Sequence, residues 1–182
     1  MIPDAEGPAV VIGVGNVLLG DDGVGVRAVE ALRAIAERDP GALPEATRLV
    51  DGGTLGVDLL AEVEGARSLL LIDAVDLDQP AGTVTVLRGA EIQAAGSAWG
   101  RCIPGGVGEL LAVARLMGWL PQSVALVGVQ VGKTELGTGL SEPVAAALPR
   151  AVAAVLDHLS QLGGLVATAG GPGGGSPKGA TA

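Results

Sequence analysis

The sequence predicts a single α/β domain: a three-layer sandwich with a mostly parallel central sheet, one antiparallel edge strand and helices on both faces. Apolar runs of strand length alternate with amphipathic segments along the chain, which is typical of this fold class. Neither Phe nor Tyr occurs among the 182 residues, so Val, Leu, Ile and Ala have to fill the core. That composition is typical of a parallel sheet that helices cover on both faces.

Five segments have the length and composition of strands: residues 9–14, 47–50, 68–74, 83–87 and 123–130. The segment 68–74 (SLLLIDA) is almost continuously apolar, and it therefore suits the centre of the sheet. The segment 83–87 (TVTVL) alternates polar and apolar residues, so it predicts the edge strand, with one face in water.

Helices are expected where apolar residues recur at helical spacing: residues 24–38, 55–65, 109–117 and a long segment after 141. Thr54 is placed to cap the second helix, and Ser141 followed by Glu142 and Pro143 is a favourable start for the last one. Pro149 lies inside the last helix. It predicts a kink or a restart there, because proline removes a backbone hydrogen bond.

A glycine-rich segment closes the chain. Residues 163–182 hold eight of the 31 glycines and no sustained apolar face. Such a segment cannot offset the entropy lost on ordering. We therefore expect one α/β domain over residues 1–162, followed by a disordered tail over residues 163–182.

Charge and composition exclude several function classes. The chain has 11 basic and 20 acidic residues, and the basic ones are scattered, which argues against binding nucleic acid through its phosphates. No apolar run approaches the roughly 20 residues of a membrane-spanning helix, and the N-terminus lacks the pattern of a secretory signal. A single cysteine, Cys102, excludes a disulfide framework. We expect a cytoplasmic protein that binds neither nucleic acid nor membrane.

Polar side chains follow the predicted strands, where each strand ends. They are Asn16, Asp21, Asp22, Asp51, Thr54, Asp73, Asp76, Gln130, Lys133 and Glu135. In open α/β sheets, ligands lie beyond the carboxyl ends of the strands, where these side chains would meet. Carboxylates gathered there repel one another unless a cation or a basic partner segment joins them. The sequence therefore predicts an acidic site at this edge.

Other kinds of site fit less well. The run Gly13-Val14-Gly15-Asn16 begins like a dinucleotide fingerprint, but Leu18 stands where the third glycine is needed, and no P-loop motif occurs. Binding of a nucleotide or metabolite is thus the weaker alternative. Conventional protease motifs are absent as well. The only histidine, His158, is expected on the surface near the end of the last helix, where positive charge is favoured.

Several ordered blocks of the sequence resemble the hydrogenase maturation proteases. They are residues 11–26 (VIGVGNVLLGDDGVGV), 51–54 (DGGT), 70–75 (LLIDAV), 109–116 (ELLAVARL) and 127–141 (VGVQVGKTELGTGLS). The first block is the most specific, because G-x-G-N followed by a paired acidic-Asp-Gly-x-Gly turn is rare outside this family. The resemblance runs from about residue 9 to residue 160.

The resemblance implies an endopeptidase that removes the C-terminal extension of a nickel–iron hydrogenase large-subunit precursor after nickel insertion. Nickel carried by the precursor acts as the recognition signal, and the protease contributes ligands to it. Asp22 stands where the family has its first ligand and Asp73 where it has the second, so both are the expected catalytic and metal-binding residues. Carboxylate oxygens suit a divalent ion that substrate thiolates hold in part.

The family's third ligand, a histidine shortly before the helix at 109–117, has no counterpart here. An ungapped match places Ile103 at that position, and a shifted register places Gly105 there; neither side chain can ligate. Cys102 is adjacent, and its thiolate would be a soft metal ligand, although a lone cysteine also suits a small buried site. Three interpretations therefore stay open: an enzyme that uses the two carboxylates plus another contact, an enzyme that recognises its substrate differently, and a non-cutting protein that holds or inspects the nickel-loaded precursor.

Residues beside the two expected ligands have structural interpretations. Asp21 is expected to cap the helix at 24–38 or to favour its positive end, with Asp22 pointing outward. Asn16 is expected to shape its turn through side-chain-to-backbone hydrogen bonds, and Asp51 to act similarly.

The roles of two further groups stay open. Asp76 is expected to be a solvated loop residue or a partner of the ligand shell, and Gln130 either binds substrate backbone or closes its strand. Gly105, Gly106 and Gly108 either let a substrate tail approach the backbone closely or belong to a flexible loop.

Overall fold

A computed structural model describes residues 7–94 and 107–169, and side chains up to residue 162. Its sheet has five strands in the order β2-β1-β3-β5-β4. Their bounds are β1 Ala9–Val14, β2 Thr47–Gly53, β3 Ser68–Val75, β4 Val84–Arg88 and β5 Ser123–Gln130. All neighbours are parallel except β4, which pairs antiparallel with β5 at the edge. The predicted fold class, including the antiparallel edge strand, is confirmed.

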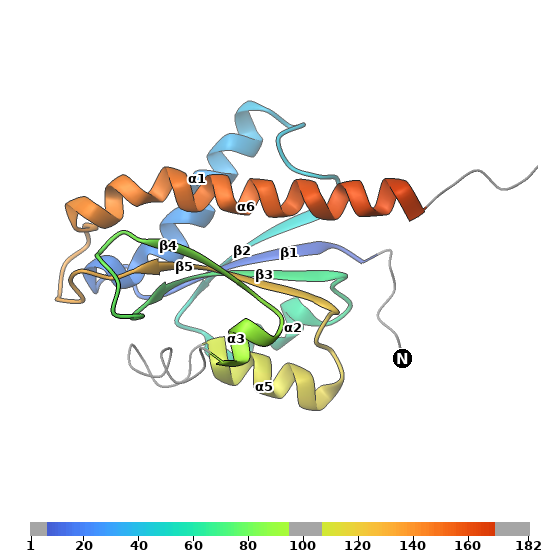
Figure 1. Ribbon diagram of the computed structural model, residues 1–182, viewed down its shortest axis with the longest axis horizontal. Helices are drawn as coiled ribbons and strands as arrows, with labels where there is room; N and C mark the ends of the chain where they lie inside the picture. Colours follow the sequence, from blue (N-terminus) through green and yellow to red (C-terminus); the bar gives the residue numbers. More distant parts are fainter. Residues whose placement is uncertain (1–6, 95–106, 170–182) are drawn as a thin grey trace, which may run out of the picture.

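Helices cover both faces of the sheet. Helices α1 (Val24–Arg38) and α6 (Glu142–Ala169) lie on one face, and α2 (Leu60–Val63), α3 (Ala90–Ala94) and α5 (Val107–Met117) lie on the other (Figure 1). Because side chains alternate along a strand, β1 sends Val11 to the first core and Ile12 to the second. The apolar runs therefore serve two cores at once.

The start of α1 packs directly on the sheet, and glycines make this possible. A Cβ at Gly25 would lie 2.3 Å from the Val14 and Ile72 carbonyl oxygens, and one at Gly13 would lie 2.1 Å from the Gly25 carbonyl oxygen. The glycine pattern that resembles a dinucleotide fingerprint thus serves a close contact between helix and sheet.

The second expected helix, residues 55–65, is shorter and begins differently. A 3₁₀ turn at Gly56–Leu59 leads into α2, and Leu55, not Thr54, precedes the turn without a side-chain cap. The cap expected at Thr54 is wrong, because the turn begins after Leu55, whose carbonyl oxygen accepts the Asp58 N–H at 3.0 Å. Backbone hydrogen bonding closes this turn instead.

Helix α6 corrects two further expectations. It continues through Pro149 as a single helix, so the expected interruption is wrong (Figure 1). Ala147, Ala151 and Val155 are fully buried on either side of the proline, and this packing offsets the lost hydrogen bond. Its backbone also includes residues 163–169, which were assigned to the tail, whereas residues 170–182 lie outside the described part of the chain. Across residues 7–94 and 107–169, no helix has both the length and the apolar character that a membrane crossing needs.

The connections place the reversal of strand order between β1 and β3. The chain leaves β1 through α1 on one face to reach β2, and it returns through α2 on the other face to β3. Strands β1 and β3 are neighbours whose connections run in opposite directions, which is the topological switch point of an open α/β sheet. Ligands bind at the carboxyl end of such a point.

Candidate functional site

The loop after β1 forms a tight turn that presents two aspartates. The Asn16 Oδ1 accepts the Leu18 N–H at 2.9 Å, so the turn-shaping role expected for Asn16 is confirmed. Gly15 has φ of +126°, and a Cβ there would lie 1.8 Å from the Asp22 carbonyl oxygen. The turn therefore needs glycine at this position. A 3₁₀ helix, Gly20–Gly23, follows and carries both Asp21 and Asp22.

Asp22 lies inward, not outward as expected. Its side chain is only 4% exposed, and Oδ2 accepts the Asn16 N–H at 2.7 Å. Burial raises the pKa of the Asp22 carboxyl above its ordinary value of 3.8, against the opposing effect of that hydrogen bond. A buried carboxylate with one hydrogen bond keeps free lone pairs, which a cation could use.

Asp73 lies within β3, near its carboxyl end. It alternates with Leu71 and Val75, whose side chains belong to the core under α2 and α5, so Asp73 is on that face. Burial raises the pKa of its carboxyl to about 8, the Ala74 N–H opposes the rise, and the negative charge of Asp22 adds to it. In the free protein, Asp73 is therefore mostly protonated at neutral pH.

The 3₁₀ helix that carries Asp22 packs against β3, and the negative charge of Asp22 contributes to the raised pKa of Asp73, so the two carboxyl groups lie near each other at the switch point. Residues 7–94 and 107–162 contain two ion pairs, Arg27–Glu30 and Arg48–Glu62. Neither of these pairs includes Asp22 or Asp73. The same residues contain no group of three His, Cys, Asp or Glu side chains that could hold a metal ion. Cys102, together with Ile103, Gly105 and Gly106, lies outside the described residues, so its ligand role stays a prediction.

Asp21 joins the loops after β1 and β5 through hydrogen bonds to the second of these loops. Its fully buried carboxylate accepts the N–H groups of Gly132 (2.8 Å), Lys133 (2.7 Å) and Ser141 (2.6 Å), and the Ser141 hydroxyl (2.8 Å). Burial by itself raises the pKa of Asp21, but these four hydrogen bonds outweigh it and hold the pKa below 3.8. The expected capping of α1 is wrong, since Gly23 precedes that helix without a side-chain cap.

Replacing Asp21 by Asn is expected to lower the free energy of unfolding by about 3 kcal/mol, because buried N–H groups would lose their acceptor. Ser141→Ala removes only the hydroxyl donor and should cost about 1 kcal/mol.

The stabilisation that Asp21 provides should also depend on pH. Since the pKa of Asp21 is lowered in the folded protein, its stabilisation is present above pH 3.8 and lost as the pH falls through the folded pKa. Urea unfolding measures the effect of each substitution and of pH on the free energy of unfolding. An unchanged urea midpoint for Asp21→Asn would contradict the stabilising role of the Asp21 carboxylate.

Gln130 organises the loop after β3. Its Oε1 accepts the N–H groups of Leu77 (2.7 Å) and Gln79 (3.3 Å), and its Nε2 donates to Asp76 Oδ1 at 3.2 Å. Gln130 is buried at the end of β5. Its described contacts therefore agree with the interpretation that it closes its strand. Asp76 is tied to Gln130 rather than fully solvated.

The remaining predicted residues lie on the rim. Asp51 is exposed and accepts the Gly53 N–H at 3.1 Å, which confirms its turn-shaping role. Lys133 and Glu135 are exposed in the loop after β5. Gly108 lies in the first turn of α5, with open space where a Cβ would be.

His158 is not a surface residue. It is 7% exposed, well inside α6, and its Nδ1 is buried with no hydrogen-bond partner in the described part of the chain. Burial lowers the pKa of His158, and the charge of Arg88 in β4 adds to this effect. The expectation is wrong because α6 continues beyond this turn and packs it against the sheet. His158 is therefore not available to the acidic pair.

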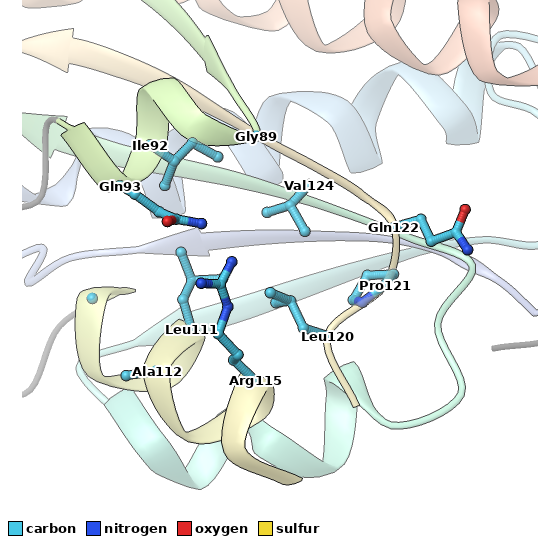
Figure 2. A pocket seen from close by; sticks show the side chains of 11 residues that line it. Gly89, Ile92, Gln93, Leu111, Ala112, Arg115, Leu120, Pro121, Gln122 and Val124 are labelled. Atoms are coloured by element: carbon cyan, nitrogen blue, oxygen red, sulfur yellow. The ribbon is translucent and has the colours of Figure 1, made fainter. Parts of the chain in front are cut away.

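Sequence reasoning missed a cavity of about 420 Å³ between α3, α5 and the start of β5 (Figure 2). Apolar side chains such as Ile92, Leu111 and Val124 line it. Gln93 and Arg115 face each other across it. In the orientation of the Gln93 amide that pairs donors with acceptors, its oxygen accepts the guanidinium N–H groups of Arg115. The cavity adjoins the amino end of β5, away from the acidic pair, and no motif in the sequence points to it.

Comparison with known proteins agrees with this architecture. The HycI hydrogenase maturation protease model matches residues 26–158. The chain is 38% identical over 156 residues to the hydrogenase expression/formation protein HupM of Azotobacter chroococcum mcd 1, covering 85% of this chain and 72% of that protein. It is 34% identical over 157 residues to the hydrogenase 2 maturation protease of Escherichia coli K12, covering 85% and 92%.

A solved structure is similar over nearly the same range. The hydrogenase-maturating endopeptidase HybD from Escherichia coli superposes with a TM-score of 0.75 at 34% identity, covering 86% of this chain and 94% of that one. The family match spans most of the domain and includes β3, which carries Asp73. The chain therefore belongs to the hydrogenase maturation protease family.

Proposed function

We propose that this protein is the endopeptidase that removes the C-terminal extension of a nickel–iron hydrogenase large-subunit precursor after nickel insertion. Support comes from the family and from one observation: at the switch point of the sheet, Asp22 lies near enough to Asp73 for its charge to contribute to the raised pKa of Asp73, and no cationic side chain is paired to either in the described residues. Two such carboxyl groups, Asp22 buried and Asp73 half-buried, are costly to hold side by side. A divalent cation brought by the substrate would offset that cost.

Nickel is part of the substrate in this proposal. Precursor thiolates hold the ion, and oxygen atoms of Asp22 and Asp73 complete its coordination. Asp73 gives up its proton on binding, because the positive charge of nickel outweighs the burial that holds its pKa at about 8. A precursor without nickel offers no such compensation, so the carboxyl pair discriminates between loaded and empty precursor.

Cleavage then requires water to add to the scissile carbonyl, the C–N bond to break and the new amine to take up a proton. A nickel ion next to that bond would polarise the carbonyl or orient the water. In either case the aspartates fix the ion relative to the peptide. They serve as ligands, and no Ser or Cys nucleophile is assigned.

A non-cutting binding protein is the second candidate. The only histidine of the chain, His158, is buried in α6, so it does not supply the third ligand that the family resemblance implies. Such a protein would hold the nickel-loaded precursor through the same two carboxylates and release it uncut.

Incubation of the purified protein with nickel-loaded and nickel-free precursor tests both candidates. We expect intact mass spectrometry to show a shortened large subunit only from the loaded precursor. Equal cleavage of both precursors would refute recognition through nickel. Tight binding of the loaded precursor without cleavage would favour the non-cutting candidate.

A further inference from the structure

Two exposed leucines mark the rim beside the acidic pair. Leu18 in the loop after β1 is 55% exposed, and Leu136 in the loop after β5 is 88% exposed. Side chains of this size normally gain from burial, and an apolar patch beside a site often marks a contact surface. Leu55, 54% exposed in the loop after β2, lies at the same edge of the sheet.

The backbone holds the loops of Leu18 and Leu136 together. The Gly137 N–H donates to the Leu18 carbonyl oxygen at 2.9 Å, and the Gly20 N–H donates to the Gly137 carbonyl oxygen at 2.7 Å. A short parallel bridge joins Leu19 to Gly137. With the four hydrogen bonds to Asp21, these contacts fix the backbones of the two loops relative to each other, so little backbone entropy is lost when a partner binds there.

This surface is continuous with the acidic pair. The Leu18 N–H is bonded to the Asn16 side chain, and the Asn16 N–H is bonded to the Asp22 carboxylate. The Asp22 N–H in turn donates to the Leu19 carbonyl oxygen at 3.2 Å. A partner whose cation reached Asp22 and Asp73 would therefore lie close to the turn that carries Leu18, and the loop of Leu136 is bonded to that turn.

We propose that Leu18 and Leu136 form the docking surface for an apolar segment of the hydrogenase precursor that flanks its nickel site. The inference rests on the proposed function. The carboxylates select the cation, whereas the leucines contribute affinity for the polypeptide around it. Removing either leucine should therefore weaken precursor binding and leave the chemical step almost unchanged.

The variants Leu18→Ser and Leu136→Ser test this surface, with Leu116→Ser as the matched control. Leu116 is 85% exposed in α5, outside the two loops. We expect KM for the nickel-loaded precursor to rise about tenfold in each rim variant, with kcat within about twofold of the wild type. The Leu116 variant should match the wild type in both constants, and thermal unfolding checks that all three fold.

Two results would overturn the docking surface: KM within about twofold of the wild type in both rim variants, or an equal rise in the Leu116 variant. The dissociation constant of the same precursor is measured in parallel. If the wild type binds the precursor but does not cleave it, the protease proposal is refuted. The docking surface is then supported by a tenfold loss of affinity in the rim variants and refuted by unchanged affinity. A wild type that neither binds nor cleaves refutes both.

Discussion

Replacing Asp73 by Asn is expected to abolish precursor processing and, at the same time, to stabilise the fold. The side chain is a proposed nickel ligand, and an amide is a poorer ligand than a carboxylate. The folded protein holds the proton of Asp73 up to a pKa of about 8, whereas an unfolded chain releases it near 3.8. Asparagine has no proton to release, so it avoids this penalty.

The sign and pH range of the stabilisation follow from linkage. Between pH 3.8 and about 8, the folded state binds a proton at Asp73 that the unfolded state does not, so wild-type stability falls as the pH rises. The Asn variant lacks this fall. We expect it to be more stable at pH 7 by on the order of 2 kcal/mol, and nearly equal to the wild type at pH 4.

Urea unfolding at the two pH values, with a processing assay alongside, measures both effects. Asp78→Asn is the matched control, because Asp78 is an exposed aspartate in the loop directly after β3. It should be unchanged in stability and in processing. An Asp73→Asn variant that was less stable at pH 7 would show that Asp73 is a structural residue in its charged form.

Replacing Asp22 by Asn is expected to lower the rate of processing at least about a hundredfold with little change in stability. An asparagine oxygen can still accept the Asn16 N–H that Asp22 now binds, so the turn should keep its shape. The variant lacks the charge that a divalent ion needs.

A second effect of this substitution can be measured without precursor. Because the charge of Asp22 contributes to the raised pKa of Asp73, removing it should lower that pKa. Carboxyl carbon chemical shifts followed through a pH titration report the change. An unaltered Asp73 titration would mean that the two carboxyl groups do not act as a pair, and full processing by Asp22→Asn would refute its ligand role.

Local patterns were enough to predict most of the fold. The predicted bounds of β1, β5 and α1 agree with the structure, because burial on one face or both leaves a periodic pattern in each segment. The position of the acidic pair also followed from the sequence. The carboxyl ends of parallel strands meet at one edge, and Asp22 and Asp73 both lie there.

Contacts between distant segments could not be predicted. The hydrogen bonds of Asp21 reach residues 111 to 120 positions further along the chain, and a helix-capping aspartate has the same local pattern. The burial of His158 depends on how far α6 extends over the sheet. Pro149 and the later glycines predicted a shorter or interrupted helix, so the sequence did not show this burial. Exposure of Leu18 and Leu136 was equally invisible, because an apolar residue in a loop carries no sign of which way it faces.

The Asp21 contacts have a consequence for biosynthesis. They link a turn near the N-terminus to the connection between β5 and α6, so the turn that carries Asp22 gains its last hydrogen bonds only after Ser141 has left the ribosome. Closing a loop of that span is an entropically costly, late event. A nascent chain that has made only β1, β2 and β3 therefore has both aspartates but lacks the hydrogen bonds that join the turn of Asp22 to the later loop, and it gains these bonds as its last helix begins.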